Sequence, residues 1–150
     1  MQEVRMTKLD CVPLQQGAVL HAIKDIDVGY AGFQEAYFSE IYPGQIKGWK
    51  RHKLMTLNLV VPIGSVRFVL FDDRAQSETF GKMSVFTLSR EQYFRLTVPP
   101  MIWVAFQGLD IDTSLVLNVA NLRHDSEEVD RLSLDQIVFE WQAPLKKGLD

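Results

Sequence analysis

Apolar residues in this chain recur in short runs separated by clusters of turn-forming residues. Prolines and glycines mark the breaks at 43–44, 62–64, 99–100 and 108–112. Short apolar runs at spacings of about ten residues, with turn signals between them, are typical of an all-β sandwich or barrel. The runs that we expect to be strands are 33–41, 46–53, 56–61, 65–72, 83–88, 93–98, 102–107 and 114–120.

Alternation along these runs predicts which side chains share a face. In 46–53, Gly48, Lys50 and His52 should lie on one face, and Lys47, Trp49, Arg51 and Lys53 on the other. In 33–41, alternate residues from Phe33 to Ile41, Tyr37 and Ser39 included, should share a face. We expect 56–61 and 65–72 to pair as a hairpin around the turn 62–64.

The two ends of the chain are patterned differently. Residues 1–16 are a mixed lead-in, and 18–24 form a plausible edge strand. Residues 17–141 should hold the barrel and a C-terminal segment, and 142–150 should be a tail. Within that segment, the acidic run 124–131 predicts a helical turn capped by Asp125 or Ser126, and 137–141 is a last apolar piece.

Composition narrows the function classes. The chain has 150 residues, which suits one domain, and a net charge of −3, which offers no field to attract nucleic acid. Its single cysteine, Cys11, suits a reducing compartment. The first seven residues lack the apolar run of a signal peptide, and no stretch approaches the ~20 apolar residues of a membrane helix. We therefore expect a cytoplasmic protein that binds neither nucleic acid nor membrane.

Candidate chemistry concentrates in the basic segment 47–53. Its cations could bind a diphosphate, for which the planar fork of Arg51 is well suited. They could equally form a solvated basic strand paired with acidic neighbours. A metal needs three or four ligands, and only His52 is suitably placed, so we expect no metal. We interpret the other two histidines, His21 and His124, as structural.

Several pieces of sequence, taken in order, resemble the dTDP-4-dehydrorhamnose 3,5-epimerase family of cupins. The resemblance covers roughly 17–141, with weaker matches at 35–39 and 124–128. It implies a metal-free, cofactor-free jelly roll (a double-stranded β-helix), usually a homodimer. Such a protein binds a nucleotide-linked 4-keto sugar inside the barrel and epimerises C3 and C5 by removing a proton next to the ketone. The matching pieces are Lys47-Gly48-Trp49, Gly64, Asp72-Asp73-Arg74, 77–81, Leu88-Ser89 and Val98-Pro99-Pro100.

The same alignment identifies this chain as a divergent member that lacks the usual catalytic histidine and tyrosine. Lys50 stands where the family has its base histidine, and Val104 where it has a second histidine. The family's acid tyrosine falls on Leu117, and an acidic residue of the hairpin's return strand falls on Phe68.

Together these observations predict a nucleotide-sugar epimerase or isomerase of deoxysugar or polysaccharide biosynthesis, with Lys50 and His52 as acid/base candidates. Lysine has an ordinary pKa near ~10.4, so Lys50 serves as the base only if burial beside other cations lowers its pKa. Otherwise it stays charged and stabilises an enolate, while His52 is the base. The alternative is a non-catalytic cupin that binds sugar nucleotides or carbohydrate. The predicted substrate contacts are Lys47, Arg51, Asn58, Trp103 and Asn118, where the two asparagines and the tryptophan could also be internal packing or hydrogen-bonding residues.

Overall fold

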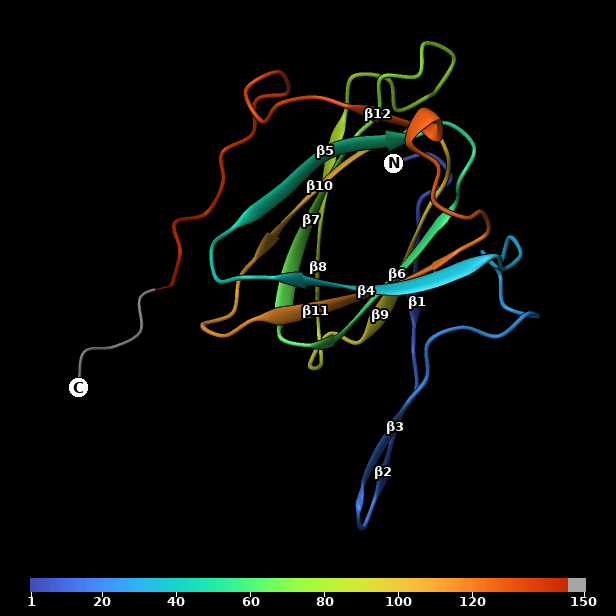
Figure 1. Ribbon diagram of the computed structural model, residues 1–150, viewed down its shortest axis with the longest axis vertical. Helices are drawn as coiled ribbons and strands as arrows, with labels where there is room; N and C mark the ends of the chain where they lie inside the picture. Colours follow the sequence, from blue (N-terminus) through green and yellow to red (C-terminus); the bar gives the residue numbers. More distant parts are fainter. Residues whose placement is uncertain (146–150) are drawn as a thin grey trace.

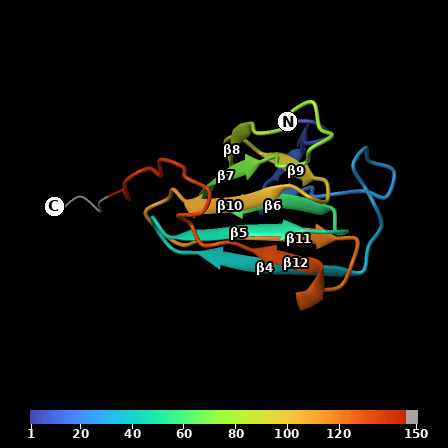
Figure 2. The same cartoon turned by 90° about the horizontal axis from the view of Figure 1, so that it is seen from above.

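Two five-stranded antiparallel sheets face each other in a computed structural model that describes residues 1–145 (Figure 1, Figure 2). The arrangement is a jelly roll, which confirms the predicted all-β class. The first sheet has the order β1 (Arg5–Lys8), β9 (Phe94–Val98), β6 (Leu57–Ile63), β11 (Ser114–Ala120) and β4 (Glu35–Ile41). The second has the order β12 (Val129–Arg131), β5 (Ile46–His52), β10 (Trp103–Gly108), β7 (Ser65–Phe71) and β8 (Met83–Ser89).

All eight expected strands are present, displaced by at most two residues at their ends. The expected hairpin between the third and fourth of them is wrong. β6 pairs with β9 and β11 in the first sheet, whereas β7 pairs with β8 and β10 in the second. β6 and β7 then contribute buried apolar residues from two different sheets of the barrel. Gly64 makes this crossing, with φ of 83° and a backbone that lies directly against Ser114.

The N-terminal region contributes more structure than a lead-in. β1 pairs with β9 and so completes the first sheet. β2 (Cys11–Leu14) and β3 (Gly17–Leu20) pair only with each other and form a hairpin that projects from the barrel (Figure 1). The expected edge strand 18–24 is therefore half of this hairpin followed by non-strand residues.

Helical structure in the described chain is confined to one turn, Ser126–Glu128. The Asp125 side chain caps it by accepting a hydrogen bond from the Glu127 backbone N–H at 3.0 Å, which confirms the predicted turn and cap. The residues that follow were not expected to be a strand, yet they form β12 along the edge of β5. No helix within residues 1–145 is long and apolar enough to cross a membrane. The predicted tail is described as far as residue 145, and 146–150 lie outside the described residues.

Apolar packing fills part of the interior and both outer faces. The main cluster lies between the sheets around the fully buried Phe68 and Leu96. On the outer face of the second sheet, the C-terminal segment covers Trp49, whose indole N–H donates to the Ile137 carbonyl at 3.1 Å. The apolar piece 137–141 is thus a cover for the sheet. The interior that this packing leaves open forms the pocket described next.

Candidate functional site

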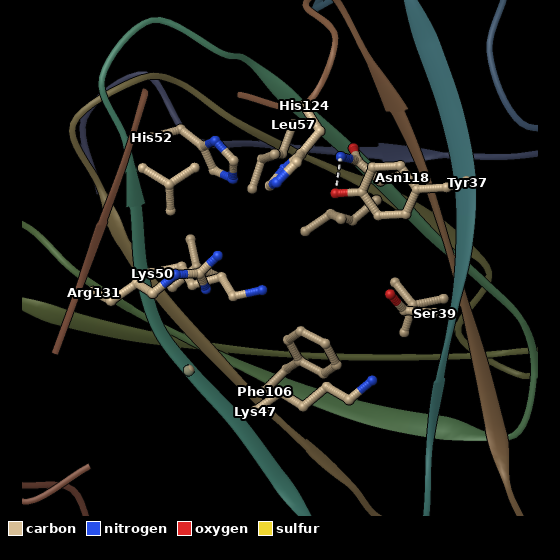
Figure 3. Close-up of a pocket in the computed structure, with 15 residues that line it drawn as sticks. Tyr37, Ser39, Lys47, Lys50, His52, Leu57, Phe106, Asn118, His124 and Arg131 are labelled. Atoms are coloured by element: carbon tan, nitrogen blue, oxygen red, sulfur yellow. Dashed lines mark hydrogen bonds between the residues drawn. The ribbon is translucent and has the colours of Figure 1, made fainter. Parts of the chain in front are cut away.

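The hollow part of the barrel lies between β4 and β11 on one side and β5, β10 and β12 on the other (Figure 3). Its volume is about 240 Å³. Apolar side chains such as Leu59 and Phe106 also line it. The polar and charged side chains that line it are Tyr37, Ser39, Lys47, Lys50, His52, Asn118, His124 and Arg131.

A bulge in β5 brings both Lys47 and Lys50 into this pocket. In the pairing with β10, Lys50 lies opposite Val104 and Lys47 lies opposite Phe106. The distance of three residues along β5 therefore matches two along β10, so β5 has one extra residue. Simple alternation placed Lys47 on the opposite face from Lys50, and that placement is wrong. An extra residue in one strand shifts the side-chain alternation by one position. Gly48 lies within the bulge, where a Cβ atom would meet the Cβ of Ala105.

The pocket is strongly cationic. Lys47, Lys50 and Arg131 line it, and no aspartate or glutamate of residues 1–145 does so. Desolvation in the pocket lowers the pKa of the Lys50 ammonium, and the charges of Arg131 and Lys47 lower it further. Cations held close together without carboxylate partners favour an anionic ligand.

His52 is held by a carboxylate from the far end of the chain. Its Nδ1 lies 2.9 Å from Oε1 of Glu128, and both side chains are about nine-tenths buried, with exposures of 11% and 9%. Glu128 also accepts hydrogen bonds from the backbone N–H groups of Lys53 and Met55, each at 3.2 Å. A carboxylate in these contacts can only accept, so Nδ1 of His52 must carry hydrogen. In the neutral ring, Nε2 then keeps a free lone pair toward the pocket, which is the arrangement of a general base.

The wall opposite His52 carries hydroxyl and amide groups. The Tyr37 ring comes from β4, and its phenol oxygen accepts a hydrogen bond from Nδ2 of Asn118 at 3.1 Å (Figure 3). Ser39 follows two residues along the same strand. Lys50 and Tyr37 point toward each other from these two walls (Figure 3). A ligand in the pocket would therefore meet acid/base groups on both of its faces.

Three of the predicted substrate contacts lie elsewhere. Arg51 is on the outer face of the second sheet, where it forms ion pairs of 2.8 Å with Asp73 and with Asp130. The Trp103 ring lies beneath the Arg51 guanidinium at 4.6 Å, and its indole N–H donates to Asp73. These two residues belong to a structural cluster, because alternation turns them away from Lys50 and His52.

Asn58 is likewise an internal residue. It is 3% exposed, accepts a hydrogen bond from the Thr97 hydroxyl at 2.7 Å, and donates to the Gly29 carbonyl at 3.1 Å. It does not line the pocket, whereas Lys47, Lys50, His52 and Asn118 do. The structure therefore brings together both catalytic candidates and two of the five predicted substrate contacts.

The four positions at which the resemblance led us to expect departures from the family pattern lie in different parts of the barrel. Lys50 and Val104 line the pocket. Leu117 packs instead with the cluster on the outer face of the first sheet, and Phe68 is in the barrel core. On β11 the residues that face the pocket are Val116 and Asn118, so Leu117 does not occupy a site position.

Sequence reasoning missed several site residues. His124, expected to be structural, lines the pocket, and so do Tyr37 and Arg131. Glu128 was not singled out either, although the acidic run around it resembled the family. A signal was available for Tyr37, since alternation correctly placed it with Ser39 on one face of its strand. No group of three or more histidine, cysteine, aspartate or glutamate side chains within residues 1–145 is placed to hold a metal ion.

A jelly-roll barrel that encloses a cationic pocket and a histidine–carboxylate pair defines a ligand-binding protein of the cupin class. No protein-family model matches the chain. A solved dTDP-sugar isomerase from Desulfovibrio desulfuricans is 35% identical to it, with a TM-score of 0.90 over 93% of this chain and 91% of that one. The chain belongs to this family of dTDP-sugar isomerases and epimerases, which confirms the resemblance at that level.

Two more distant relatives have names from glycan and polysaccharide biosynthesis. One is a probable low-salt glycan biosynthesis epimerase of Haloferax volcanii, 27% identical over 115 residues, which are 73% of this chain and 74% of that protein. The other is a spore coat polysaccharide biosynthesis protein of Bacillus subtilis, 21% identical over 147 residues, which are 95% of this chain and 97% of that protein.

Proposed function

We propose that this protein is a nucleotide-sugar epimerase or isomerase that removes a proton next to the ketone of a 4-keto-6-deoxy sugar nucleotide. The observation that carries the proposal is the His52–Glu128 pair, which opens into a cationic pocket without carboxylates. The family places such chemistry on dTDP-linked sugars, and two relatives are named for glycan and for polysaccharide biosynthesis. We therefore place the reaction in deoxysugar or polysaccharide biosynthesis.

The size of the pocket supports a sugar as the enclosed part of the ligand. Sites for drug-sized ligands occupy about 300–1,000 Å³. At about 240 Å³, this pocket holds a hexose ring more readily than a whole nucleotide sugar. A surface depression that shares Ser39 and Lys47 with the pocket continues outward between β4 and β5. We propose that the diphosphate lies near Lys47 and that the nucleoside extends along this depression.

The geometry favours His52 over Lys50 as the base. His52 has a free Nε2 and a carboxylate that stabilises the imidazolium formed when the ring takes a proton. Lys50 forms no ion pair with any carboxylate of the described chain. Its ammonium is available to stabilise negative charge on the enolate oxygen as the C–H bond breaks. We assign proton removal to His52 and charge stabilisation to Lys50.

Deuterium exchange tests the proposal directly. The protein is incubated in deuterium oxide with a dTDP-linked 4-keto-6-deoxyhexose, and NMR follows deuterium at C3 and C5 of the sugar. Exchange at either carbon, above a protein-free control, supports an enzyme. Thermal stabilisation by the sugar nucleotide without any exchange supports the alternative, a non-catalytic binding cupin.

Replacement of Lys50 should separate ligand binding from stability. In Lys50→Met we expect affinity for the dTDP-linked 4-keto sugar to fall at least about tenfold, because Lys50 faces the sugar and hydrogen bonds to charged groups contribute about 1.5–3 kcal/mol. The free variant should melt higher than wild type at neutral pH. The folded state lowers the pKa of Lys50 and therefore disfavours its charged form, so this destabilisation is present at neutral pH and fades as the pH rises toward the ordinary lysine value.

Titration calorimetry measures the affinity, and scanning calorimetry measures the melting temperature. Lys53→Met is the matched control, because Lys53 pairs with Asp130 outside the pocket at 3.5 Å. Unchanged affinity for the dTDP-linked 4-keto sugar in Lys50→Met would contradict the assignment of Lys50 to the ligand site.

We also propose that the protein is a cytoplasmic homodimer and that the β2–β3 hairpin packs on the second copy. The hairpin exposes Val12, Leu14 and Val19 at 41%, 56% and 47%, and an isolated two-stranded hairpin is marginally stable in water. Its exposed Cys11 fits a reducing compartment.

Replacing the three exposed apolar residues of this hairpin, Val12, Leu14 and Val19, by serine should halve the mass measured by light scattering. The paired control Ile111→Ser/Val138→Ser, which removes exposed apolar residues elsewhere, should leave it unchanged.

A further inference from the structure

The hydrogen bonds around Tyr37 determine which way its hydroxyl can donate. Tyr37 on β4 and Asn118 on β11 are directly opposite each other in the antiparallel pair. The backbone N–H of Asn58 donates to Oδ1 of Asn118 at 3.1 Å. Because a backbone N–H is always a donor, Oδ1 must face Asn58 and Nδ2 must face Tyr37.

The Tyr37 oxygen is therefore an acceptor in its contact with Asn118, and its own hydrogen is not used there. No group within residues 1–145 accepts a hydrogen bond from this hydroxyl. Asn118 is 2% exposed, so water competes little for the amide and its orientation is held. The phenol hydrogen remains free to point into the pocket, on the wall opposite His52 and Lys50 (Figure 3).

The other groups that line the pocket decide which controls the test needs. Lys47, Lys50 and Arg131 line the same pocket, and no carboxylate of the described chain does. Ser39 and His124 are the other proton-bearing groups on or near this wall, so the test must separate them from Tyr37.

We propose that Tyr37 is the proton donor for inversion at the carbon next to the ketone and that Asn118 is its positioning residue. This inference rests on the proposed function. In the first step, His52 Nε2 takes the proton of that carbon, and the C–H electron pair forms an enolate whose oxygen faces Lys50. In the second step, the O–H bond of Tyr37 breaks and its proton is added to the opposite face of the same carbon. The ketone re-forms, leaving Tyr37 as phenolate and His52 as imidazolium, and exchange with solvent restores both.

Tyr37→Phe tests this assignment, because it keeps the ring and removes only the hydroxyl. In deuterium oxide, we expect exchange at the carbon next to the ketone to continue at close to the wild-type rate. Formation of the inverted sugar should fall about 100-fold or more, the usual contribution of a general acid. Formation of inverted sugar at the wild-type rate would overturn the proposal. An equal loss of exchange and inversion would also overturn it, because the hydroxyl would then act in binding.

Two further variants separate a positioning effect from a structural one. In Asn118→Asp, the carboxylate would accept from Tyr37 and turn its hydrogen away from the pocket, so inversion should fall while exchange continues. For His124→Gln we compare the ratio of inversion to exchange: a ratio that falls as in Tyr37→Phe would assign the donor to His124 and overturn the proposal, and an unchanged ratio supports Tyr37. If wild type shows no exchange at all, the proposed function fails. If wild type exchanges and inverts and Tyr37→Phe does the same, only this inference fails.

Discussion

Replacing His52 with glutamine should slow deuterium exchange next to the ketone about 100-fold to 10,000-fold, the range that a general base contributes. The pocket would keep its cations, so thermal stabilisation by dTDP should be largely retained. Exchange followed by NMR and binding followed by calorimetry measure the two effects separately. His21→Gln is the matched control, because His21 lies outside the pocket and lines a separate small depression.

The Glu128→Gln variant extends this test to the residue that holds His52. The carboxylate of Glu128 accepts hydrogen bonds through both of its oxygens, from His52 and from two backbone N–H groups. An amide offers only one oxygen, so at least one of these donors would face an NH₂ group. We expect a loss of exchange smaller than in His52→Gln. Wild-type exchange in His52→Gln would identify Lys50 or another group as the base and would contradict our assignment.

Replacing Gly64 with alanine should lower the free energy of unfolding by about 2–4 kcal/mol, as strain from a left-handed backbone and from overpacking add. Gly64 has φ of 83°, and an added Cβ would lie 2.6 Å from the Cβ of Ser114. The glycine stands where the chain passes from β6 to β7, so this connection would have to move away from Ser114 at the start of β11. Urea denaturation measures the loss.

Gly81 provides a control that isolates the steric part of this effect. Its φ of 73° is similar, but an added Cβ would meet nothing within 4 Å. Gly81→Ala should therefore cost only the backbone strain, about 1–2 kcal/mol. Equal losses in the two variants would show that the close contact with Ser114 contributes nothing.

The predictions that held concern local features. Strand positions follow from the alternation of apolar and polar residues and from the prolines and glycines between runs, both of which act over a few residues. Asp125 was expected as a cap for the same reason, because a capping side chain bonds to the backbone two residues ahead. The concentration of cations in 47–53 was also visible, and Lys50 and His52 do line the pocket.

The predictions that failed concern which strands pair and which face of a sheet a side chain lies on. Sequence neighbours joined by a short turn were expected to form a hairpin, yet β6 and β7 lie in different sheets. The bulge that turns Lys47 into the pocket depends on how β5 pairs with β10, and alternation within β5 gives no sign of it. Alternation within β5 did place Arg51 on the opposite face from Lys50 and His52, but the charge of Arg51 and the aromatic ring of Trp103 suggested contacts with the substrate.

The chain's sequence determined an all-β barrel, its strand positions and a basic segment suited to an anionic ligand, because each depends on residues close together in the chain. Tertiary structure alone decided the chemistry of the pocket. Glu128 reaches His52 across 76 positions of sequence, and Asn118 orients Tyr37 across 81. Such contacts depend on which strands become neighbours, and that choice is made by burial over the whole barrel.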